Sequence, residues 1–413
     1  MSARSAFPHL SFLCTFLVLL CNSHVRAETT SNADFQDSSQ TNEFAFLQSM
    51  SIEVPEPEWT FLFEVNNTGT AEHSDRERIS AEKYEWLAEA DYLILDYETD
   101  HFQSYYGLYG HYSHGLAGGS LRAEWDFFQA RNELSLSDTS FETEDIGRGY
   151  GGFLLKEIFS ENELLTFGVG ARVQTVSIDQ SEAFQNEDNN RFFLWGLKAS
   201  YAFYSPQTLV SLSFLLEKNS ASIADTKPIE QQDVFTYEVD PEFKVMSWFF
   251  DFQWSPQTMA DATFLFKASG GGQNSFKDRL YPQSQKTLGG LNSVRGYDDD
   301  VVSGDDALWY RIEPTFLLAK TSNTKQWLSV FYDYGKVKNK TVDLSRFPPF
   351  FAEIIARVLP PESLTLRSVG VGYEWEYSTH TGLYLAYGKA LEDDDVSTEK
   401  GDSQIHARLK FQF

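Results

Sequence analysis

The chain of 413 residues carries a formal net charge of −27, and it contains 35 Phe, 20 Tyr and 9 Trp. So acidic a protein repels the phosphates of nucleic acid, which excludes nucleic acid as an expected partner. Its two cysteines, Cys14 and Cys21, both lie in an N-terminal segment that we interpret as a removable signal. The mature chain is therefore expected to have neither a disulfide framework nor a cysteine nucleophile.

Residues 1–27 have the pattern of a secretory signal peptide. Arg4 precedes an apolar run from Leu10 to Leu20, and Val25-Arg-Ala27 offers small residues for cleavage. A membrane-spanning helix needs about 20 apolar residues, and beyond this segment no apolar run approaches that length. If the mature chain crosses a bilayer, it must do so as a closed β-barrel, because lipid leaves unpaired backbone groups without partners.

The stretch before residue 91 is irregular in sequence. Residues 28–43 are polar and predict a disordered leader. Two short apolar-rich runs, 44–54 and 58–65, predict a first hairpin of strands. A serine followed by Ala-Glu-Lys predicts a helix from Ser80 to Ala90, so residues 66–90 are expected to form a connector or a plug helix.

From Asp91 onward the sequence becomes a regular series of strands with alternating apolar and polar residues. Short links such as 205–208 and 255–258 alternate with long ones such as 218–242 and 272–305. Outer-membrane barrels have this asymmetry, with short periplasmic turns and longer outer loops. The fourteen candidate strands are 91–98, 102–113, 119–134, 149–158, 163–178, 191–204, 207–217, 243–256, 259–271, 306–320, 326–338, 364–377, 381–390 and 403–413.

The last strand shows the two faces most clearly. Leu409, Phe411 and Phe413 alternate with Arg408 and Lys410, so one face suits lipid and the other suits water. A soluble β-sandwich would give the same alternation with its apolar face inward. The signal peptide, the loop asymmetry and the terminal phenylalanine favour the membrane barrel.

One motif stands out within the long loop 272–305. Leu288-Gly-Gly-Leu-Asn-Ser-Val-Arg-Gly-Tyr297 places a single arginine, Arg295, on a glycine-rich arm, and Ser303-Gly-Asp305 follows it. Phe331-Tyr-Asp-Tyr-Gly335 and the terminal Phe413 come later, in that order. Together these features resemble the C-terminal barrel of the outer-membrane polypeptide transporters, and within them the hemolysin-activator branch of two-partner secretion.

The resemblance sets the expected fold. Barrels of that family have sixteen strands, so we predict an all-β, transmembrane outer-membrane barrel of sixteen antiparallel strands over residues 44–413. The first pair would be 44–54 and 58–65, and the long loop 272–305 would fold inward between the eleventh and twelfth strands. The alternative is a barrel of fourteen strands with residues 28–90 outside the sheet or inside the lumen.

The resemblance also implies a contact inside the lumen. In the family the loop arginine pairs with an inward acid of the thirteenth strand, where alternation turns Phe331, Asp333 and Gly335 inward. Here that contact would join Arg295 to Asp333 as a bidentate, charge-assisted pair in a partly wet lumen.

The neighbouring residues of the motif have expected parts as well. Gly296, between Val294, Arg295 and Tyr297, would let the backbone approach the wall, while Gly289 and Gly290 would permit a sharp entry turn. Two further charges, Arg311 and Glu313, face inward on the twelfth strand. They either contact the loop or merely line the wall.

The sequence offers no sign of an enzyme. It contains no serine elbow, no phosphate-binding loop and no convincing pair of catalytic acids. Acidic clusters such as Asp298–Asp300 lack the spacing of a calcium site. We therefore predict no catalytic residues, no metal and no cofactor.

The resemblance implies an outer-membrane protein of a Gram-negative bacterium that translocates or inserts polypeptides. Its expected partners are outer-membrane lipid and an unfolded polypeptide passenger. Family members carry periplasmic domains ahead of the barrel, and residues 28–90 hold at most a fragment of one. A separate periplasmic partner and the barrel-assembly machinery are therefore further expected partners. The alternative is a passive porin-like or structural surface barrel, which would have no need for a lock between Arg295 and Asp333.

Overall fold

The computed structural model describes most of the chain beyond residue 58. The signal peptide, the polar leader and the expected strand 44–54 lie outside the described residues. The described ranges are 59–67, 76–87, 91–100, 105–116, 120–136, 141–180, 188–224, 226, 239, 241–281, 284–298, 301–340, 362–377, 380–394 and 398–413.

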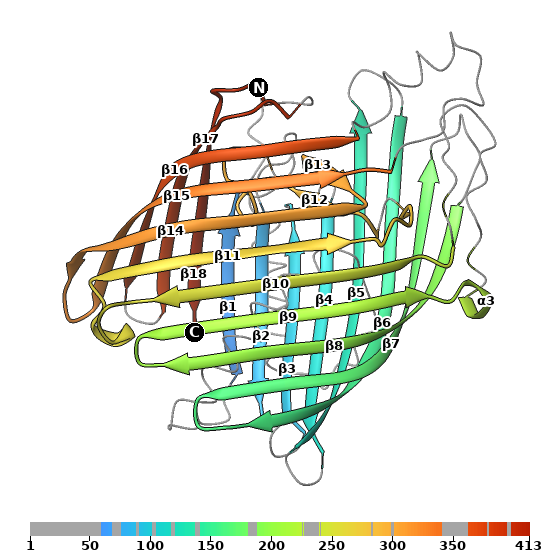
Figure 1. The fold of residues 1–413 in the computed structure, drawn as a ribbon, viewed down its shortest axis with the longest axis horizontal. Helices are drawn as coiled ribbons and strands as arrows, with labels where there is room; N and C mark the ends of the chain where they lie inside the picture. Colours follow the sequence, from blue (N-terminus) through green and yellow to red (C-terminus); the bar gives the residue numbers. More distant parts are fainter. Residues whose placement is uncertain are drawn as a thin grey trace, which may run out of the picture.

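Sixteen antiparallel strands form one closed barrel, in which each strand pairs with the next one along the chain and the last pairs with the first (Figure 1). The predicted fold and strand number are thus confirmed. The barrel strands are β1 (Trp59–Asn66), β2 (Arg76–Tyr84), β3 (Asp91–Thr99), β4 (Tyr105–Gly115), β5 (Leu121–Leu136), β6 (Phe141–Phe159), β7 (Glu163–Gln180), β8 (Asp188–Ser205), β9 (Thr208–Asn219), β10 (Lys244–Trp254), β11 (Phe264–Asn274), β14 (Asp306–Lys320), β15 (Thr324–Lys338), β16 (Ser363–Tyr377), β17 (Thr381–Ala390) and β18 (Ser403–Gln412).

The aromatic C-terminus closes the barrel against β1. Phe63 lies opposite Phe411 in the register of β1 and β18, and their rings stack with centroids 6.5 Å apart. The backbone N–H of Phe413 donates to the carbonyl oxygen of Phe61 at 2.9 Å, and the N–H of Phe61 donates back at 3.1 Å. Closure satisfies backbone groups that would otherwise face lipid unpaired.

The expected helix from Ser80 to Ala90 is wrong, because residues 76–84 form strand β2. Ser80 lies opposite Leu62 of β1 and Asp96 of β3, and its buried hydroxyl donates to the Asp96 carboxylate. A helix here would leave the facing edges of β1 and β3 unpaired, which lipid does not permit. The first pair of strands is therefore β1, close to the predicted 58–65, and β2.

Few helical residues accompany the sheet. Within the described ranges they form α3 (Ala221–Ala224) and the 3₁₀ turn η1 (Met259–Asp261). None of the helices in this part of the chain is long and apolar enough to cross a membrane.

The two faces of the wall differ as the alternation predicts. On β15, Leu328 and Val330 are 38% and 50% exposed on the outer surface, whereas Phe331 and Asp333 are 2% and 0% exposed inside. On this strand the outer surface is thus apolar where it meets lipid, and the inner surface carries the buried Asp333.

The segment between β11 and β14 folds into the barrel. It contains a short hairpin, β12 (Lys286–Leu288) and β13 (Val302–Gly304), which contacts β14 and β15. We call residues 275–305 the pore loop. Its apolar side chains pack in one buried cluster with inward residues of β14, β15, β16 and β17. The cluster comprises Leu288, Val294, Tyr297, Val302, Ala307, Trp309, Val337, Leu364, Leu366 and Ala390.

Candidate functional site

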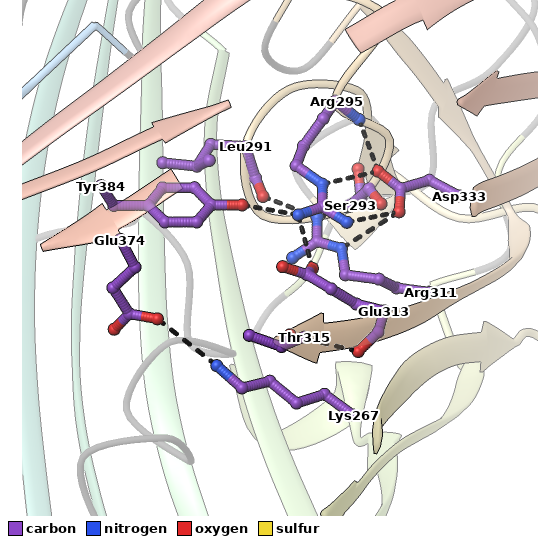
Figure 2. A network of polar contacts seen from close by, with 10 residues as sticks. All are labelled: Lys267, Leu291, Ser293, Arg295, Arg311, Glu313, Thr315, Asp333, Glu374 and Tyr384. Atoms are coloured by element: carbon purple, nitrogen blue, oxygen red, sulfur yellow. Dashed lines mark hydrogen bonds and ion pairs between the residues drawn. The ribbon is translucent and has the colours of Figure 1, made fainter. Parts of the chain in front are cut away.

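Arg295 at the tip of the pore loop meets Asp333 on β15, as Figure 2 shows. The Arg295 Nε donates to Asp333 Oδ2 at 2.9 Å, and Nη2 donates to Oδ1 at 2.9 Å. The backbone N–H of Arg295 adds a third bond to Oδ2 at 3.0 Å. The carboxylate thus binds both the side chain and the main chain of one residue, which fixes the position of the loop tip.

Three more side chains complete the surroundings of the guanidinium. Its Nη1 donates to Glu313 Oε2 and to the Tyr384 hydroxyl, both at 2.6 Å. The guanidinium carbon lies 3.4 Å from the centre of the Phe331 ring, a cation–π contact. Arg295 is therefore enclosed by residues from β14, β15 and β17, which bring together positions far apart in sequence.

Arg311 on β14 binds the loop as well as the wall. Its Nε lies 3.3 Å from Asp333 Oδ1, and its Nη2 donates to the carbonyl oxygen of Leu291 at 2.7 Å. Of the two alternatives left by the sequence, Arg311 and Glu313 therefore make direct contact with the loop. Two arginines and two carboxylates form the cluster, so their formal charges balance.

Burial makes this balance necessary. Arg295 and Asp333 are both 0% exposed, rather than partly wet as the sequence analysis expected. Burial by itself lowers the pKa of the Arg295 guanidinium, but the charges of Asp333 and Glu313 outweigh it and hold that pKa above its ordinary value. The loop tip thus remains cationic while it is docked.

Glycines make room for the loop on the wall. A Cβ at Gly388 of β17 would stand 2.3 Å from the carbonyl oxygen of Arg295. A Cβ at Gly335 of β15 would stand 2.8 Å from Val294 Cγ2, and one at Gly296 would stand 2.5 Å from Ser368 Cβ. Loop and wall approach closely at these three positions because none of them carries a side chain.

The entry of the loop depends on two further glycines. Gly289 and Gly290 have φ angles of +133° and +72°, which other residues rarely adopt. The N–H of Gly289 donates to Ser293 Oγ at 2.7 Å, and that hydroxyl donates to the Gly289 carbonyl oxygen at the same distance. This turn brings the chain back on itself before Arg295.

Tyr297 and Asp305 secure the two ends of the motif. The Tyr297 hydroxyl lies 3.1 Å from the carbonyl oxygen of Arg367 and 2.8 Å from that of Glu392, at the outer ends of β16 and β17. Asp305 is fully buried, and its carboxylate accepts hydrogen bonds from the backbone N–H groups of Leu280 and Lys340 at 2.9 and 2.8 Å. Each residue joins the pore loop to another outer segment.

Sequence reasoning missed several residues of this site. Tyr384 and Gly388 of β17 were not singled out, although strand alternation turns both inward. His406 of β18 donates from Nε2 to the carbonyl oxygen of Arg295 at 2.9 Å, so the proton of this bond is on Nε2. The inward alternation of His406 was visible, but nothing in the sequence pointed to its partner 111 residues away.

Within the described ranges, no group of three or more His, Cys, Asp or Glu side chains is placed to hold a metal ion. The contacts of the site are non-covalent, namely ion pairs and hydrogen bonds.

These features define the class of the protein. A closed barrel with an apolar outer surface and a polar interior occupied by its own loop is an outer-membrane β-barrel. Residues 165–346 match the model of the family described as haemolysin secretion/activation protein ShlB/FhaC/HecB. Over these residues the expected resemblance to the two-partner secretion transporters is confirmed, and the barrel is located in the outer membrane. The matching family is one of transporters, not of enzymes.

Solved structures share the fold. CdiB from Escherichia coli is similar with a TM-score of 0.69 and 16% sequence identity, over 87% of this chain and 64% of that one. CdiB from Acinetobacter baumannii is similar with a TM-score of 0.62 and 16% sequence identity, over 86% of this chain and 60% of that one. BamA from Haemophilus ducreyi, in a structure lacking POTRA domains 1-3, is similar with a TM-score of 0.58 and 13% sequence identity, over 94% of this chain and 80% of that one. The chain spans less than two thirds of either CdiB structure, and no curated protein matches its sequence.

Proposed function

We propose that this barrel translocates an unfolded polypeptide across the outer membrane, or inserts it there, and that the pore loop closes the lumen when no polypeptide is present. Arg295 anchors the closed position through Asp333 and Glu313.

The observation that carries the proposal is the fully buried charge at the loop tip. Moving an arginine out of water is costly unless matched acids receive it, and here Asp333 and Glu313 do so. A porin that only needs an open lumen gains nothing from such a pair. A transporter that must stay sealed between substrates does, because the lock keeps ions from leaking through.

Opening follows from the same chemistry. When the loop leaves, water enters and solvates Arg295, Asp333 and Glu313, so the loss of the ion pairs is partly offset by hydration. The pairs are therefore strong enough to favour closure and weak enough for an entering polypeptide to replace them. The polar inner wall then faces the passenger.

Single-channel conductance of the refolded barrel in planar bilayers tests this. We expect wild-type protein to be mostly closed, and Arg295→Ala and Asp333→Ala to open or flicker alike, because each removes one side of the same pair. Equal and stable opening of all three proteins would refute the gate and favour a passive pore. Translocation itself is tested by export of a fluorescently labelled unfolded passenger from vesicles that contain the barrel.

A further inference from the structure

The outer surface of β15, β16 and β17 carries a row of positive charge at the end of the barrel that bears the long loops. Lys336, Arg367 and Lys389 all point outward, since each lies an even number of residues from an exposed apolar neighbour of its strand, such as Val330, Val369 and Tyr387. Arg367 and Lys389 are exposed and Lys336 is partly exposed. In a chain of net charge −27, three outward cations on adjacent strands are a local reversal of sign.

The strand registers place these residues in one diagonal line. Lys336 lies opposite Thr365, two residues before Arg367, and Lys389 lies opposite Val369, two residues after Arg367. Diagonal neighbours on one face of a sheet stand roughly 7–8 Å apart. The three cations are therefore close enough to act on one ligand.

The line runs close to parallel with the membrane plane. Following directly opposite residues around the barrel, the row from Leu62, in the middle of β1, reaches Phe192, near the outer end of β8. A line that stays at one depth in the membrane must therefore shift toward the periplasmic end each time it passes from one strand to the next strand along the chain. Lys336, Arg367 and Lys389 step in that direction by two residues per strand, so they share nearly one depth.

Aromatic and apolar side chains lie directly below the cations, on the periplasmic side. Tyr334 precedes Lys336 by two residues on the same face, and Tyr387 precedes Lys389 in the same way. Tyr334 stacks on Tyr310 with ring centroids 4.9 Å apart. Tyrosine at this position marks the boundary between the apolar core of a bilayer and its headgroups. The cations thus stand at the level of the outer-leaflet headgroups.

From this we infer that Lys336, Arg367 and Lys389 bind the phosphate groups of a phosphorylated lipid in the outer leaflet. Lysine and arginine are the residues that bind phosphate, and arginine can do so with two parallel hydrogen bonds. Among the described residues, the Arg367 side chain forms an ion pair with Glu392 alone, 3.4 Å away, and this half-exposed pair can be replaced by a phosphate. Lys336 and Lys389 form no ion pair within the part of the chain that the structure describes.

The three cations lie on the same strands that hold the pore loop. The backbone of Arg367 lies within hydrogen-bonding distance of the Tyr297 hydroxyl inside the barrel. Asp333 and Gly388, which receive the loop tip, are each within three residues of one of the cations. The lipid site and the dock of the pore loop are therefore the two faces of the same three strands. The inference itself needs only the barrel in its membrane, and does not depend on transport.

Native mass spectrometry of the full-length barrel, titrated in neutral detergent with bisphosphorylated lipid A, tests the site. Each basic residue near an anionic lipid surface contributes about a factor of five in affinity, so removing all three predicts a loss of roughly a hundredfold. The test variant is Lys336→Gln/Arg367→Gln/Lys389→Gln. The control is Lys83→Gln/Lys156→Gln/Lys320→Gln, which removes equal charge at the opposite end of the barrel.

We expect wild type and control to bind lipid A alike, the test variant to bind it roughly a hundredfold more weakly, and lipid A stripped of phosphate to bind all three equally weakly. Thermal unfolding should be the same for the three proteins, because none of the changed side chains is buried. Equal losses in control and test variant would reduce the effect to overall charge and overturn the site. Undiminished binding of the test variant, or of the phosphate-free lipid, would overturn it as well.

Discussion

Ion pairs occur inside the barrel on two opposite parts of its wall, and they differ in what they connect. On the first part, β5 to β9, Arg172 pairs with Glu217 at 2.7 Å and Lys198 with Glu124 at 2.6 Å. These pairs join strands that are not neighbours, since β8 separates the first pair and β6 and β7 separate the second. On the second part, β14 to β17, the acids instead receive Arg295 from the pore loop.

The difference shows how similar chemistry can serve two ends. Strands β7 and β9 are already fixed by hydrogen-bond ladders to β8, so the Arg172–Glu217 pair adds stability to a position that has no alternative. The pore loop has no such ladder to the wall within the described residues. Its ion pairs therefore decide where the loop lies. The ion pairs of β5 to β9 serve as an internal control for those of β14 to β17.

Neutralising one acid on each wall should give the largest contrast. Asp333→Asn leaves Glu313 as the one carboxylate of the cluster that faces Arg295 and Arg311. Breaking a buried pair costs about 3–5 kcal/mol. Because the loop can leave, we expect this cost to appear as an open channel in bilayer conductance. Glu217→Gln should leave the channel closed and lower the temperature of thermal unfolding, because Arg172 cannot leave. If both variants open the channel, the distinction between the walls fails.

A steric change should open the channel without altering any charge. A Cβ at Gly388 would meet the Arg295 carbonyl oxygen at 2.3 Å, and overpacking of this kind costs about 1–3 kcal/mol. Gly388→Ala should therefore raise the open fraction to a lesser extent than Asp333→Asn. Gly382→Ala on the same strand is the matched control, since the nearest atoms to its Cβ lie 4.0 Å away. Identical conductance of the two variants would show that the loop does not rest on Gly388 when closed.

Removing one hydroxyl should give the smallest effect. Tyr384→Phe deletes a single hydrogen bond to Arg295, worth about 1.5–3 kcal/mol to a charged group and less where other partners remain. We expect brief flickering rather than sustained opening in single-channel records. Tyr387→Phe, which loses a bond to Ser403 on the outer surface, should behave as wild type. Flickering in the second variant alone would contradict the assignment of Tyr384 to the loop dock.

Much of this architecture was readable from strand alternation. All fourteen strands predicted from residue 91 onward have a counterpart, and the inward placement of Asp333 and Glu313 followed from the period of two. Local sequence misled at Ser80, where good helix formers are held in a strand by β1 and β3. Barrel closure is a property of the whole sheet, so no short window of sequence contains it.

The site was harder to predict than the fold. The Arg295–Asp333 contact was expected through resemblance, and the structure brings those two residues together. Tyr384 and His406 escaped notice because their partner comes from a loop 89 and 111 residues earlier. Full burial of the arginine was also unexpected, since it depends on how tightly glycines such as Gly388 let the loop approach.

The Tyr297 hydroxyl has a consequence for how the barrel responds to contact from outside the cell. It holds the pore loop to the backbone at Glu392, the second residue of the last outer loop. Any antibody or phage that pulls residues 391–394 out of place must first break these bonds, so it acts mechanically on the interior. The last outer loop is thus linked to the pore loop inside the barrel. A binder raised against this outer loop would report on, or alter, whether the channel is sealed.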